Sequence, residues 1–453
     1  MKKMVSLIMV LTMVCGICAC SKQESAAPVP ADVGGSENQT TQEQVESQPY
    51  KGTSINVITC NNAATRMAVE YLNEFEEATG IKVNIEIYEP TDAIQKVAVN
   101  AAANGTGIDV FGYRPIQESL SYEENGWFAP LDDYIAEAEK DGYDYDDFFA
   151  SARAATTGKD GKIYGIPYLV EGEIIFVNTE MFAKLGLEQY PETLDELLAY
   201  CEKAYNPAEN QYGIALRGEG NQAVTQFSGF LYAHGGDFID YDTMTATMNT
   251  PEALEALEYY AELLKFGPEG ITSANLSDSQ NYYKQGLTLF RIDAYSQNPI
   301  TVDPEQSLVW DKTDYAMFPS GKNGVTPYNI TAWAWAISST SKNQGAAWEF
   351  IRWVSGKEQD IRAALDGGFG ARTSTWADTD VMQNIPENLA AVVQQTGEVG
   401  YDLDRPLCFN AAEVRALVGE MIDAANSGMR GEELKTFVET KNAEMQAILD
   451  TEK

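Results

Sequence analysis

An acidic residue, Glu171, interrupts an apolar, strand-like segment that runs from Pro167 to Val177. A carboxylate in such a segment needs a partner or a water-filled cleft, because burying an unpaired charge is costly. Asn61 and Asn62 directly follow another predicted strand. Carboxylate and amide groups recognise pairs of ligand hydroxyl groups, so these residues are candidate ligand contacts. The structural alternatives, a buried ion pair for Glu171 and an Asx turn for the asparagines, stay open.

Aromatic rings and one arginine also lie at or near predicted strands. Tyr113 and Arg114 follow a short strand, and Tyr295 follows another. Trp333 and Trp335 alternate with small residues in one strand and therefore share a face. Aromatic faces cover the apolar side of a sugar ring, so these side chains can complement the polar groups. Core packing is the alternative for the tryptophans, and we expect at least one of them in the core.

Two further candidates come from irregular segments. Gln226 ends a polar, glycine-broken loop, and Arg372 follows a glycine-rich loop that begins at Gly367. Arg372 either reaches the ligand or holds its own loop, and the sequence favours the loop. His234 is the single histidine, and its place at a predicted helix end favours packing over catalysis.

Enzyme and metal signatures are missing from the sequence. No Gly-x-Ser-x-Gly, His-Glu-x-x-His or phosphate-loop pattern occurs. The segment Asp141–Asp147 resembles a calcium loop, but it lacks the glycine and the closing glutamate at the required offsets. We therefore expect no catalytic residue, no metal and no cofactor. A secreted glycosidase with two opposed carboxylates stays open as an alternative, because the chain has 68 Asp and Glu residues.

The N-terminal sequence predicts export and lipid anchoring. A positively charged start precedes an apolar stretch, Met4–Ile17, that is too short for a typical membrane-spanning helix. The segment Ile17–Cys20 resembles a bacterial lipobox with Cys20 as the lipidated residue. We expect residues 1–19 to be a signal peptide and residues 20–50 to be a flexible tether that reaches roughly 30 Å.

Charge and length narrow the class of protein further. The net charge of −37 argues against nucleic acid as a partner and against a polybasic membrane-surface helix, and it favours solubility. A chain of 453 residues predicts two domains or lobes. Cys60, Cys201 and Cys408 are widely spaced, which argues against a disulfide framework or a zinc site and favours buried thiols.

The elements that must position the candidates alternate between strands and helices. Ser54–Thr59, Ile81–Ile87 and Ile108–Phe111 are predicted strands with helices between them. This order predicts an α/β lobe with a parallel sheet. Ligands bind such sheets at the carboxyl ends of the strands, where the pairs Asn61–Asn62 and Tyr113–Arg114 lie. The alternation recurs later in the chain.

Three segments are candidate crossings between lobes: the stretch 161–200, Ala332–Ile337 and Gly367–Arg372. Short motifs occur in a fixed order between residues 54 and 375. They are Phe75-x4-Gly80-Ile-Lys-Val83, Gly105-x3-Asp109-Val110, Gly161-Lys-x-Tyr-Gly-Ile-Pro167, Val177-Asn-x3-Phe182-x3-Gly186, Pro191-x-Thr-x2-Glu196, Gly235-Gly236, Pro251-Glu252, and Ile337-Ser-x3-Lys342-Asn with Ala347-x2-Phe350-Ile351. With these motifs in this order, the chain resembles the extracellular solute-binding proteins, family 1, which are the sugar-binding group of ABC importers.

The resemblance implies an α/β, two-lobed, periplasmic-binding-protein-like fold of type II, with three hinge crossings and a central ligand cleft. It implies a first lobe of residues 51–170 plus 337–367 and a second lobe of residues 171–333 plus 368–453. It places Glu171 at a ligand-contacting hinge position and Tyr295 where an aromatic ring stacks on a sugar. The asparagine pair and Tyr113–Arg114 fall in the family's binding loops.

Two segments, Gly218–Gln226 and Gly286–Phe290, depart from the family's pattern and leave the contacts of the second lobe open. The implied protein is a monomeric substrate-binding lipoprotein, held on the outer face of the bacterial cytoplasmic membrane. It captures a mono- or oligosaccharide by hinge closure and delivers it to permease subunits.

The same fold with a polyamine, a phosphorylated polyol or a metal chelate as ligand is the alternative. A phosphate would need clustered basic residues, and Arg114 and Arg217 are the ones near the predicted loops. A polyamine would need several carboxylates with aromatic rings, which this sequence can supply.

Overall fold

The computed structural model of the chain describes residues 48–452. The predicted signal peptide, Cys20 and nearly all of the predicted tether lie outside these residues. Within the described part of the chain, no helix combines the length and the apolar character that a membrane crossing requires. The chain forms one compact unit from Gln48 onward.

An eight-stranded mixed sheet runs through this unit in the order β2-β1-β3-β10-β4-β8-β5, with β9 paired to β4. The strands are β1 Ser54–Cys60, β2 Lys82–Tyr88, β3 Val110–Tyr113, β4 Ile166–Asn178, β5 Tyr212–Ala215, β8 Thr288–Ala294, β9 Thr313–Met317 and β10 Asn329–Ile337. The short strands β6 Ile239–Asp240 and β7 Thr245–Ala246 form a separate hairpin. Strand β1 is parallel to β2 and β3, and β5 is parallel to β8, whereas β10 and β4 are antiparallel to their neighbours.

The first lobe is built on β1, β2 and β3, with helices on both faces of the sheet. Its helices are α1 Ala63–Glu70, α2 Leu72–Thr79, α3 Pro90–Ala102, α4 Pro115–Glu124, α5 Asp132–Ala138, α6 Ala150–Ala155, α13 Gln344–Val354 and α14 Lys357–Leu365. One apolar core joins β1 to α1, α13 and α14, and a second joins β3 to α3 and α4. The strand–helix alternation predicted for this part of the sequence is confirmed.

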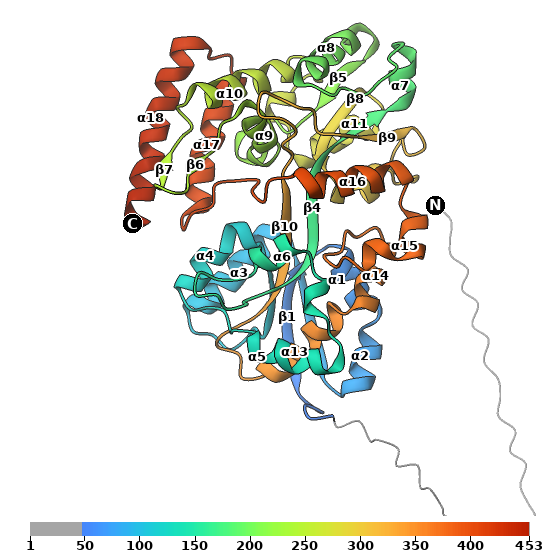
Figure 1. The fold of residues 1–453 in the computed structure, drawn as a ribbon, viewed down its shortest axis with the longest axis vertical. Helices are drawn as coiled ribbons and strands as arrows, with labels where there is room; N and C mark the ends of the chain where they lie inside the picture. The colour runs from blue at the N-terminus through green and yellow to red at the C-terminus, as the bar shows by residue number, and fades with distance from the viewer. Residues whose placement is uncertain (1–47, 453) are drawn as a thin grey trace, which may run out of the picture. The chain divides into compact units, whose positions relative to one another are not determined.

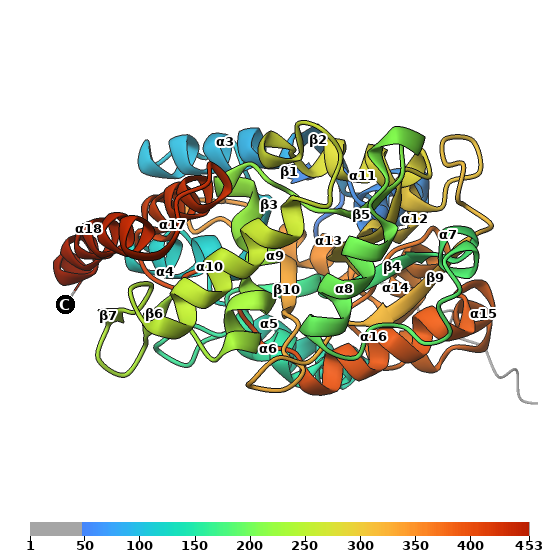
Figure 2. The same ribbon diagram turned by 90° about the horizontal axis from the view of Figure 1, so that it is seen from above.

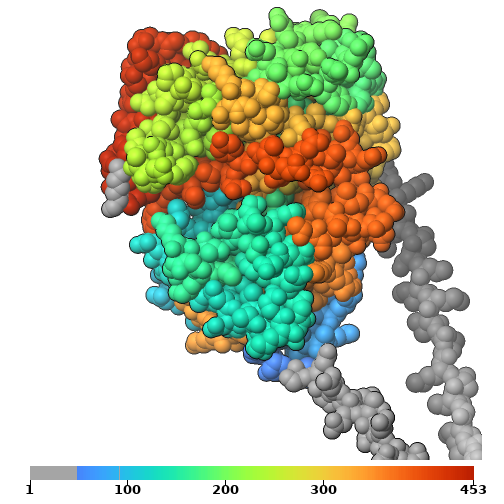
Figure 3. Space-filling view, in the orientation of Figure 1, coloured from blue at the N-terminus to red at the C-terminus, as the bar shows by residue number. Residues whose placement is uncertain are grey.

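The second lobe surrounds β5, β8 and β9. Its helices are α7 Thr179–Lys184, α8 Leu194–Ala204, α9 Gly220–His234, α10 Pro251–Leu264, α11 Leu276–Lys284, α12 Asn298–Thr301, α16 Glu387–Val399, α17 Ala411–Asn426 and α18 Gly431–Leu449, and α15 Thr379–Asn384 leads into α16. Helices α17 and α18 lie side by side next to α10 (Figure 2) and share one core with α9. In the space-filling view, the segment around α16 covers the seam between the lobes (Figure 3).

Strands β4 and β10 each belong to both lobes (Figure 1). The first half of β4 pairs with β10 in the first lobe, where Ile166 lies opposite Trp335. The second half pairs with β8 and β9 in the second lobe. Strand β10 in turn pairs with β3 through Ile337, opposite Val110. Two of the predicted crossings are therefore present as strands of one continuous sheet.

The third crossing follows α14. The carbonyl oxygen of Phe369 accepts a hydrogen bond from the N–H of Val170, at 3.1 Å, which ties this segment to β4. Gly367 has φ +82°, and a Cβ atom there would lie 2.6 Å from Cγ of Pro299 in α12. Glycine is therefore required for both the backbone conformation and the close approach.

The three cysteines of the described part of the chain, Cys60, Cys201 and Cys408, are free and buried, as expected. Within residues 48–452 there is no group of three or more His, Cys, Asp or Glu side chains that could hold a metal ion.

Candidate functional site

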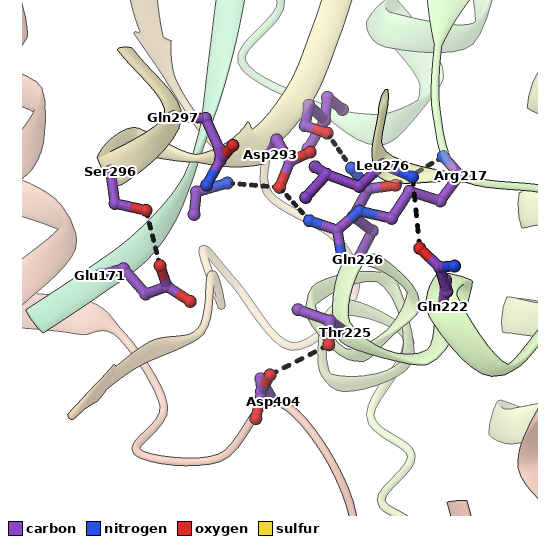
Figure 4. A network of polar contacts seen from close by, with 12 residues as sticks. Glu171, Arg217, Gln222, Thr225, Gln226, Leu276, Asp293, Ser296, Gln297 and Asp404 are labelled. Atoms are coloured by element: carbon purple, nitrogen blue, oxygen red, sulfur yellow. Dashed lines mark hydrogen bonds and ion pairs between the residues drawn. The ribbon is translucent and has the colours of Figure 1, made fainter. Parts of the chain in front are cut away.

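Glu171 lies in β4 at the point where this strand passes from one lobe to the other. Its Oε2 atom accepts a hydrogen bond of 2.6 Å from Oγ of Ser296, which follows β8 (Figure 4). Burial raises the pKa of Glu171 above its usual value, and the negative charges of Asp404 and Asp293 act in the same direction. The hydroxyl group of Ser296 opposes this effect. The carboxyl group is thus held in place but has remaining capacity to accept hydrogen bonds.

A buried charge cluster lies beside Glu171. Asp293, near the end of β8, accepts hydrogen bonds of 2.6 Å from Nη2 of Arg217 and from Nη2 of Arg291 (Figure 4 shows the first). The side chains of Asp293 and Arg291 are fully buried, and that of Arg217 is 12% exposed. Burial alone would raise the pKa of Asp293, but the two guanidinium groups hold it below its usual value. Asp293 therefore stays ionised and fixes Arg217.

Gln226 of α9 holds the backbone of the same arginine in place. Its Oε1 atom accepts a hydrogen bond of 2.7 Å from the N–H of Arg217, and its Nε2 donates to the carbonyl oxygen of Ile292, at 2.5 Å. The side chain is fully buried. Gln226 thus ties the loop after β5 to strand β8, and the hydroxyl of Tyr260 supports this loop by donating to the Arg217 carbonyl.

The segment between α16 and α17 brings a further ion pair to the site. Asp404 is fully buried and accepts a hydrogen bond of 3.0 Å from Oγ1 of Thr225 in α9 (Figure 4). Arg405 pairs with Asp404 and also donates from Nη1 to Oε1 of Gln117, at 2.6 Å. Because Gln117 belongs to α4, this hydrogen bond links the C-terminal segment of the second lobe to the first lobe.

The first lobe contributes Arg114, which immediately follows β3. Its guanidinium group binds Glu118 of α4, with Nη2 and Oε1 2.6 Å apart, and lies 5.9 Å from the ring centroid of Trp333. Trp333 is 8% exposed. The charge of Arg114 acts on Arg415 of α17, which in turn interacts with the charges of Asp404 and Arg405. Charged groups from both lobes therefore share one electrostatic environment.

The predicted asparagines take two different roles. Asn61 is exposed. Asn62 caps α1, because its Oδ1 accepts a hydrogen bond of 2.9 Å from the N–H of Thr65. Its amide group also lies 3.4 Å from the hydroxyl of Tyr168. The capping role is the Asx alternative that the sequence left open, and it leaves Asn61 as the freer side chain of the pair.

Two predicted aromatic contacts lie inside the cores. Tyr113 is fully buried among the rings of Phe111, Tyr122 and Phe128. Trp335 is 1% exposed and stacks on Tyr168, with ring centroids 4.4 Å apart. The expectation that at least one of the tryptophans lies in the core is confirmed.

Arg372 and Tyr295 are buried near the third crossing. Arg372 donates to Oδ2 of Asp147, at 3.2 Å, and its guanidinium lies 3.9 Å from the ring centroid of Phe148. These contacts hold its loop against the first lobe. Tyr295 is 2% exposed and packs on Phe369, with ring centroids 4.8 Å apart, next to the charge of Glu171.

The structure thus gathers Glu171 and Tyr295 with residues that were not in the predicted set, namely Arg217, Asp293, Ser296, Asp404 and Arg405. Asp293 and Ser296 flank Tyr295 in the sequence, so their position after a predicted strand was a usable signal. No local pattern marks Asp404 and Arg405 as site residues, because the other residues that they contact, Thr225 and Gln117, lie far away along the chain.

The chemistry of this cluster suits a neutral ligand rich in hydroxyl groups. Four arginines are each paired with a carboxylate: Arg114 with Glu118, Arg217 and Arg291 with Asp293, and Arg405 with Asp404. Paired guanidinium and carboxylate groups offer hydrogen-bond donors and acceptors without a large net charge.

Residues 63–361 match the family model of bacterial extracellular solute-binding proteins. The chain is 27% identical to the erythritol/L-threitol-binding protein of Mycolicibacterium smegmatis over an alignment of 338 residues. This alignment covers 71% of this chain and 70% of that protein.

Solved structures show the same fold. One is an ABC transporter solute-binding protein from Agrobacterium radiobacter K84 in complex with ribitol, with a TM-score of 0.78 and 22% identity, covering 88% of this chain and 100% of that chain. Another is a solute-binding protein from Agrobacterium vitis S4 with bound D-mannitol, with a TM-score of 0.70 and 25% identity, covering 88% of this chain and 98% of that one.

Proposed function

The chain belongs to the family of bacterial extracellular solute-binding proteins, and from this premise we propose that it captures a sugar or short polyol for an ABC importer. The observation that carries the proposal is the charge-paired cluster around Glu171, which presents donors and acceptors to a neutral, hydroxyl-rich ligand. Erythritol or L-threitol, ribitol and D-mannitol are named for three similar proteins, which supports this ligand class.

Ligand hydroxyl groups donate to the carboxylate of Glu171 and accept from the guanidinium groups of Arg217 and Arg405. Trp333, with Arg114 beside it, offers an apolar face from the first lobe. Because the ligand then contacts both lobes, it binds the closed arrangement more tightly than an open one and shifts the population toward closure.

The proposed contact set follows from the surroundings of each residue. We place Asn61, Asn62, Arg114, Glu171, Arg217, Tyr295, Trp333 and Arg405 around the ligand. We assign Gln226 to the support of Arg217 and Arg372 to its loop, because both hydrogen-bond protein groups there. We assign Tyr113 and Trp335 to the cores, because their rings pack against other aromatic rings.

Delivery requires a partner in the membrane. We propose that a lipid on Cys20 holds the mature, monomeric protein on the outer face of the cytoplasmic membrane, next to permease subunits of the importer. We further propose that it binds its solute without catalysing a reaction, and incubation of the purified protein with glycosides should give no product.

The pairing of the arginines bears on the alternative ligands. A phosphorylated polyol would need guanidinium groups free to pair with phosphate, whereas those of Arg114, Arg217 and Arg405 already pair with carboxylates. A polyamine would face guanidinium groups at close range. We therefore propose the neutral polyol or sugar ahead of both.

A thermal-unfolding screen tests the ligand class. A ligand at 100 times its Kd stabilises the folded state by about 2.7 kcal/mol, which raises the Tm by several degrees. The panel contains erythritol, ribitol, mannitol and maltose, with mannitol 1-phosphate and spermidine as charged comparisons. We expect an increase in Tm with at least one neutral compound. An increase confined to spermidine or to the phosphate would contradict the proposal.

A further inference from the structure

Glu173, two residues beyond Glu171 in β4, carries a buried carboxyl group whose two oxygens lack a well-formed hydrogen bond to the described residues. Its exposure is 0%, and neither Oε1 nor Oε2 has a hydrogen-bond partner within residues 48–452. Residues two apart in a strand point to the same side of the sheet, so Glu173 follows Glu171 on the side that faces α9. An ionisable group buried in this way is rare without a partner, because the desolvation of its oxygens is uncompensated.

The backbone around Glu173 leaves space for this carboxyl group. Gly229 of α9 lies directly opposite, and a Cβ atom at Gly229 would be 2.0 Å from Oε2 of Glu173. Any other residue at position 229 would displace the carboxyl group. Helix α9 is the same helix that carries Thr225 and Gln226, so Glu173 adjoins the residues that line the site.

Tyr328 supplies a second polar group without a partner at the same place. The N–H of Glu173 donates to the Tyr328 carbonyl oxygen, at 2.9 Å, so the two backbones are adjacent. The hydroxyl of Tyr328 is fully buried and has no hydrogen-bond partner among the described residues. The charges of Glu171, Glu173, Asp293 and Arg217 all act on this hydroxyl.

Glu171 and Glu173 also share their charged surroundings. Asp293, Asp404 and Arg217 interact electrostatically with both carboxyl groups. Nε of Arg217 is itself buried without a hydrogen-bond partner in the described part of the chain. Glu173 is therefore part of the cluster around Glu171 and lies further along β4 toward the second lobe.

We propose that Glu173 and Tyr328 form an inner subsite that binds a terminal hydroxyl-bearing carbon of the ligand. This inference rests on the proposed function and names the part of the ligand that enters deepest. The carboxyl oxygens accept from the ligand's hydroxyl groups, and the Tyr328 hydroxyl donates to a ligand oxygen. The subsite rejects an anionic end group, because a carboxylate or phosphate would lie close to the ionised carboxylate of Asp293.

The protonation state of Glu173 fits a neutral ligand. Burial raises the pKa of Glu173 well above its usual value, with the charge of Asp293 acting in the same direction and with Arg217 and the backbone of Tyr328 opposing it. The neutral acid both donates and accepts a hydrogen bond, as one alcohol group does toward another. Glutamine mimics this neutral form, whereas leucine removes all hydrogen-bonding capacity at similar size.

Calorimetric titration of the wild type and four variants with erythritol, ribitol and mannitol tests the subsite. Glu173→Leu and Tyr328→Phe should each raise the Kd of the tightest-binding polyol at least 10-fold. Glu173→Gln should stay within about threefold of the wild type. Tyr232→Phe removes another buried tyrosine hydroxyl that has no partner in the described chain, and it should leave the Kd unchanged. Selectivity between polyols of different length should shrink in Glu173→Leu and Tyr328→Phe.

The outcomes separate this inference from the proposed function. If the wild type binds no polyol or sugar, the proposed function and the subsite both fall. If the wild type binds a polyol and both Glu173→Leu and Tyr328→Phe keep its Kd and selectivity, the subsite alone is wrong. Circular dichroism establishes folding of each variant. If Glu173→Leu does not fold, Tyr328→Phe decides, because it removes one oxygen atom from a side chain that otherwise keeps its packing.

Discussion

Asp147 anchors the loop that follows the third crossing, and its replacement by asparagine should destabilise the protein in a pH-dependent way. The carboxylate accepts hydrogen bonds from Oγ and the N–H of Ser374, at 2.6 and 2.9 Å, from Thr373, at 2.7 Å, and from buried Arg372, at 3.2 Å. Burial alone would raise the pKa of Asp147, but these bonds lower it from 3.8 to about 2.

The size of the effect follows from that change in pKa. One pKa unit corresponds to about 1.4 kcal/mol, so the ionised form contributes about 2 kcal/mol to the free energy of unfolding. Because the folded-state pKa is depressed, this contribution is fully present above pH 4 and is lost as the pH falls toward 2. Asp147→Asn should therefore lower the free energy of unfolding at pH 7, and the difference from the wild type should shrink by about 2 kcal/mol on acidification.

Urea unfolding, followed by tryptophan fluorescence between pH 7 and pH 2.5, measures this difference. The neighbouring Asp146 provides a matched control, since its side chain is 87% exposed and its pair with Arg153 lies at the surface. Asp146→Asn should lower the free energy of unfolding by less than about 1 kcal/mol. A difference for Asp147→Asn that stays constant across this pH range would show that ionised Asp147 does not stabilise the folded state.

Three further substitutions probe the site and the contact between the lobes. Asp293→Asn leaves two buried arginines without their carboxylate, so we expect the free energy of unfolding, measured with urea, to fall by about 3 kcal/mol. A decrease below about 1 kcal/mol would contradict a stabilising role of these ion pairs. Gln117→Ala removes the hydrogen bond that Arg405 donates between the lobes, so the ligand Kd should rise about 10-fold and the ligand-free protein should show a larger radius of gyration in X-ray scattering. Unchanged values for both would argue against a role in closure. Gly229→Ala places a methyl group on the carboxyl of Glu173, so both the Tm and the polyol affinity should fall, and wild-type values for both would show that this space is not used.

The sequence predicted the architecture because hydrophobic patterning is local. Alternating strands and helices, with the charge of Glu171 inside an apolar strand, indicated the first lobe and the crossing at β4. The predicted two-lobed α/β class and the family resemblance are both confirmed by the family match and the structural neighbours. The lobe boundaries and the ligand contacts stay predictions.

The direction of individual side chains was harder to predict. Tyr113 and Arg114 are consecutive at a strand end, and the sequence cannot decide which of them enters the core. In the structure Tyr113 packs into an aromatic cluster, and Arg114 turns toward Glu118 and Trp333. Their different surroundings arise from tertiary packing that local spacing does not encode.

Contacts between residues far apart in the sequence were outside the reach of sequence patterns. Asp404 is held by Thr225, 179 residues away along the chain. Glu173 was visible in the sequence as a second acid in an apolar strand, and its significance depends on the glycine of α9 that faces it. Such pairs become evident after the chain has folded.

Isothermal titration calorimetry of the wild type, Glu171→Ala and Glu180→Ala tests whether the protein binds a neutral polyol or sugar through Glu171. We predict saturable 1:1 binding of a neutral polyol or sugar by the wild type. Removing the hydrogen-bonding carboxyl group of Glu171 should weaken binding by about 1–3 kcal/mol, which is roughly a 5- to 150-fold increase in Kd. Glu180 is 67% exposed and pairs with Lys312 at the surface, so Glu180→Ala should bind as the wild type does. No binding of any neutral polyol or sugar by the wild type, or an unchanged Kd in Glu171→Ala, would contradict the claim.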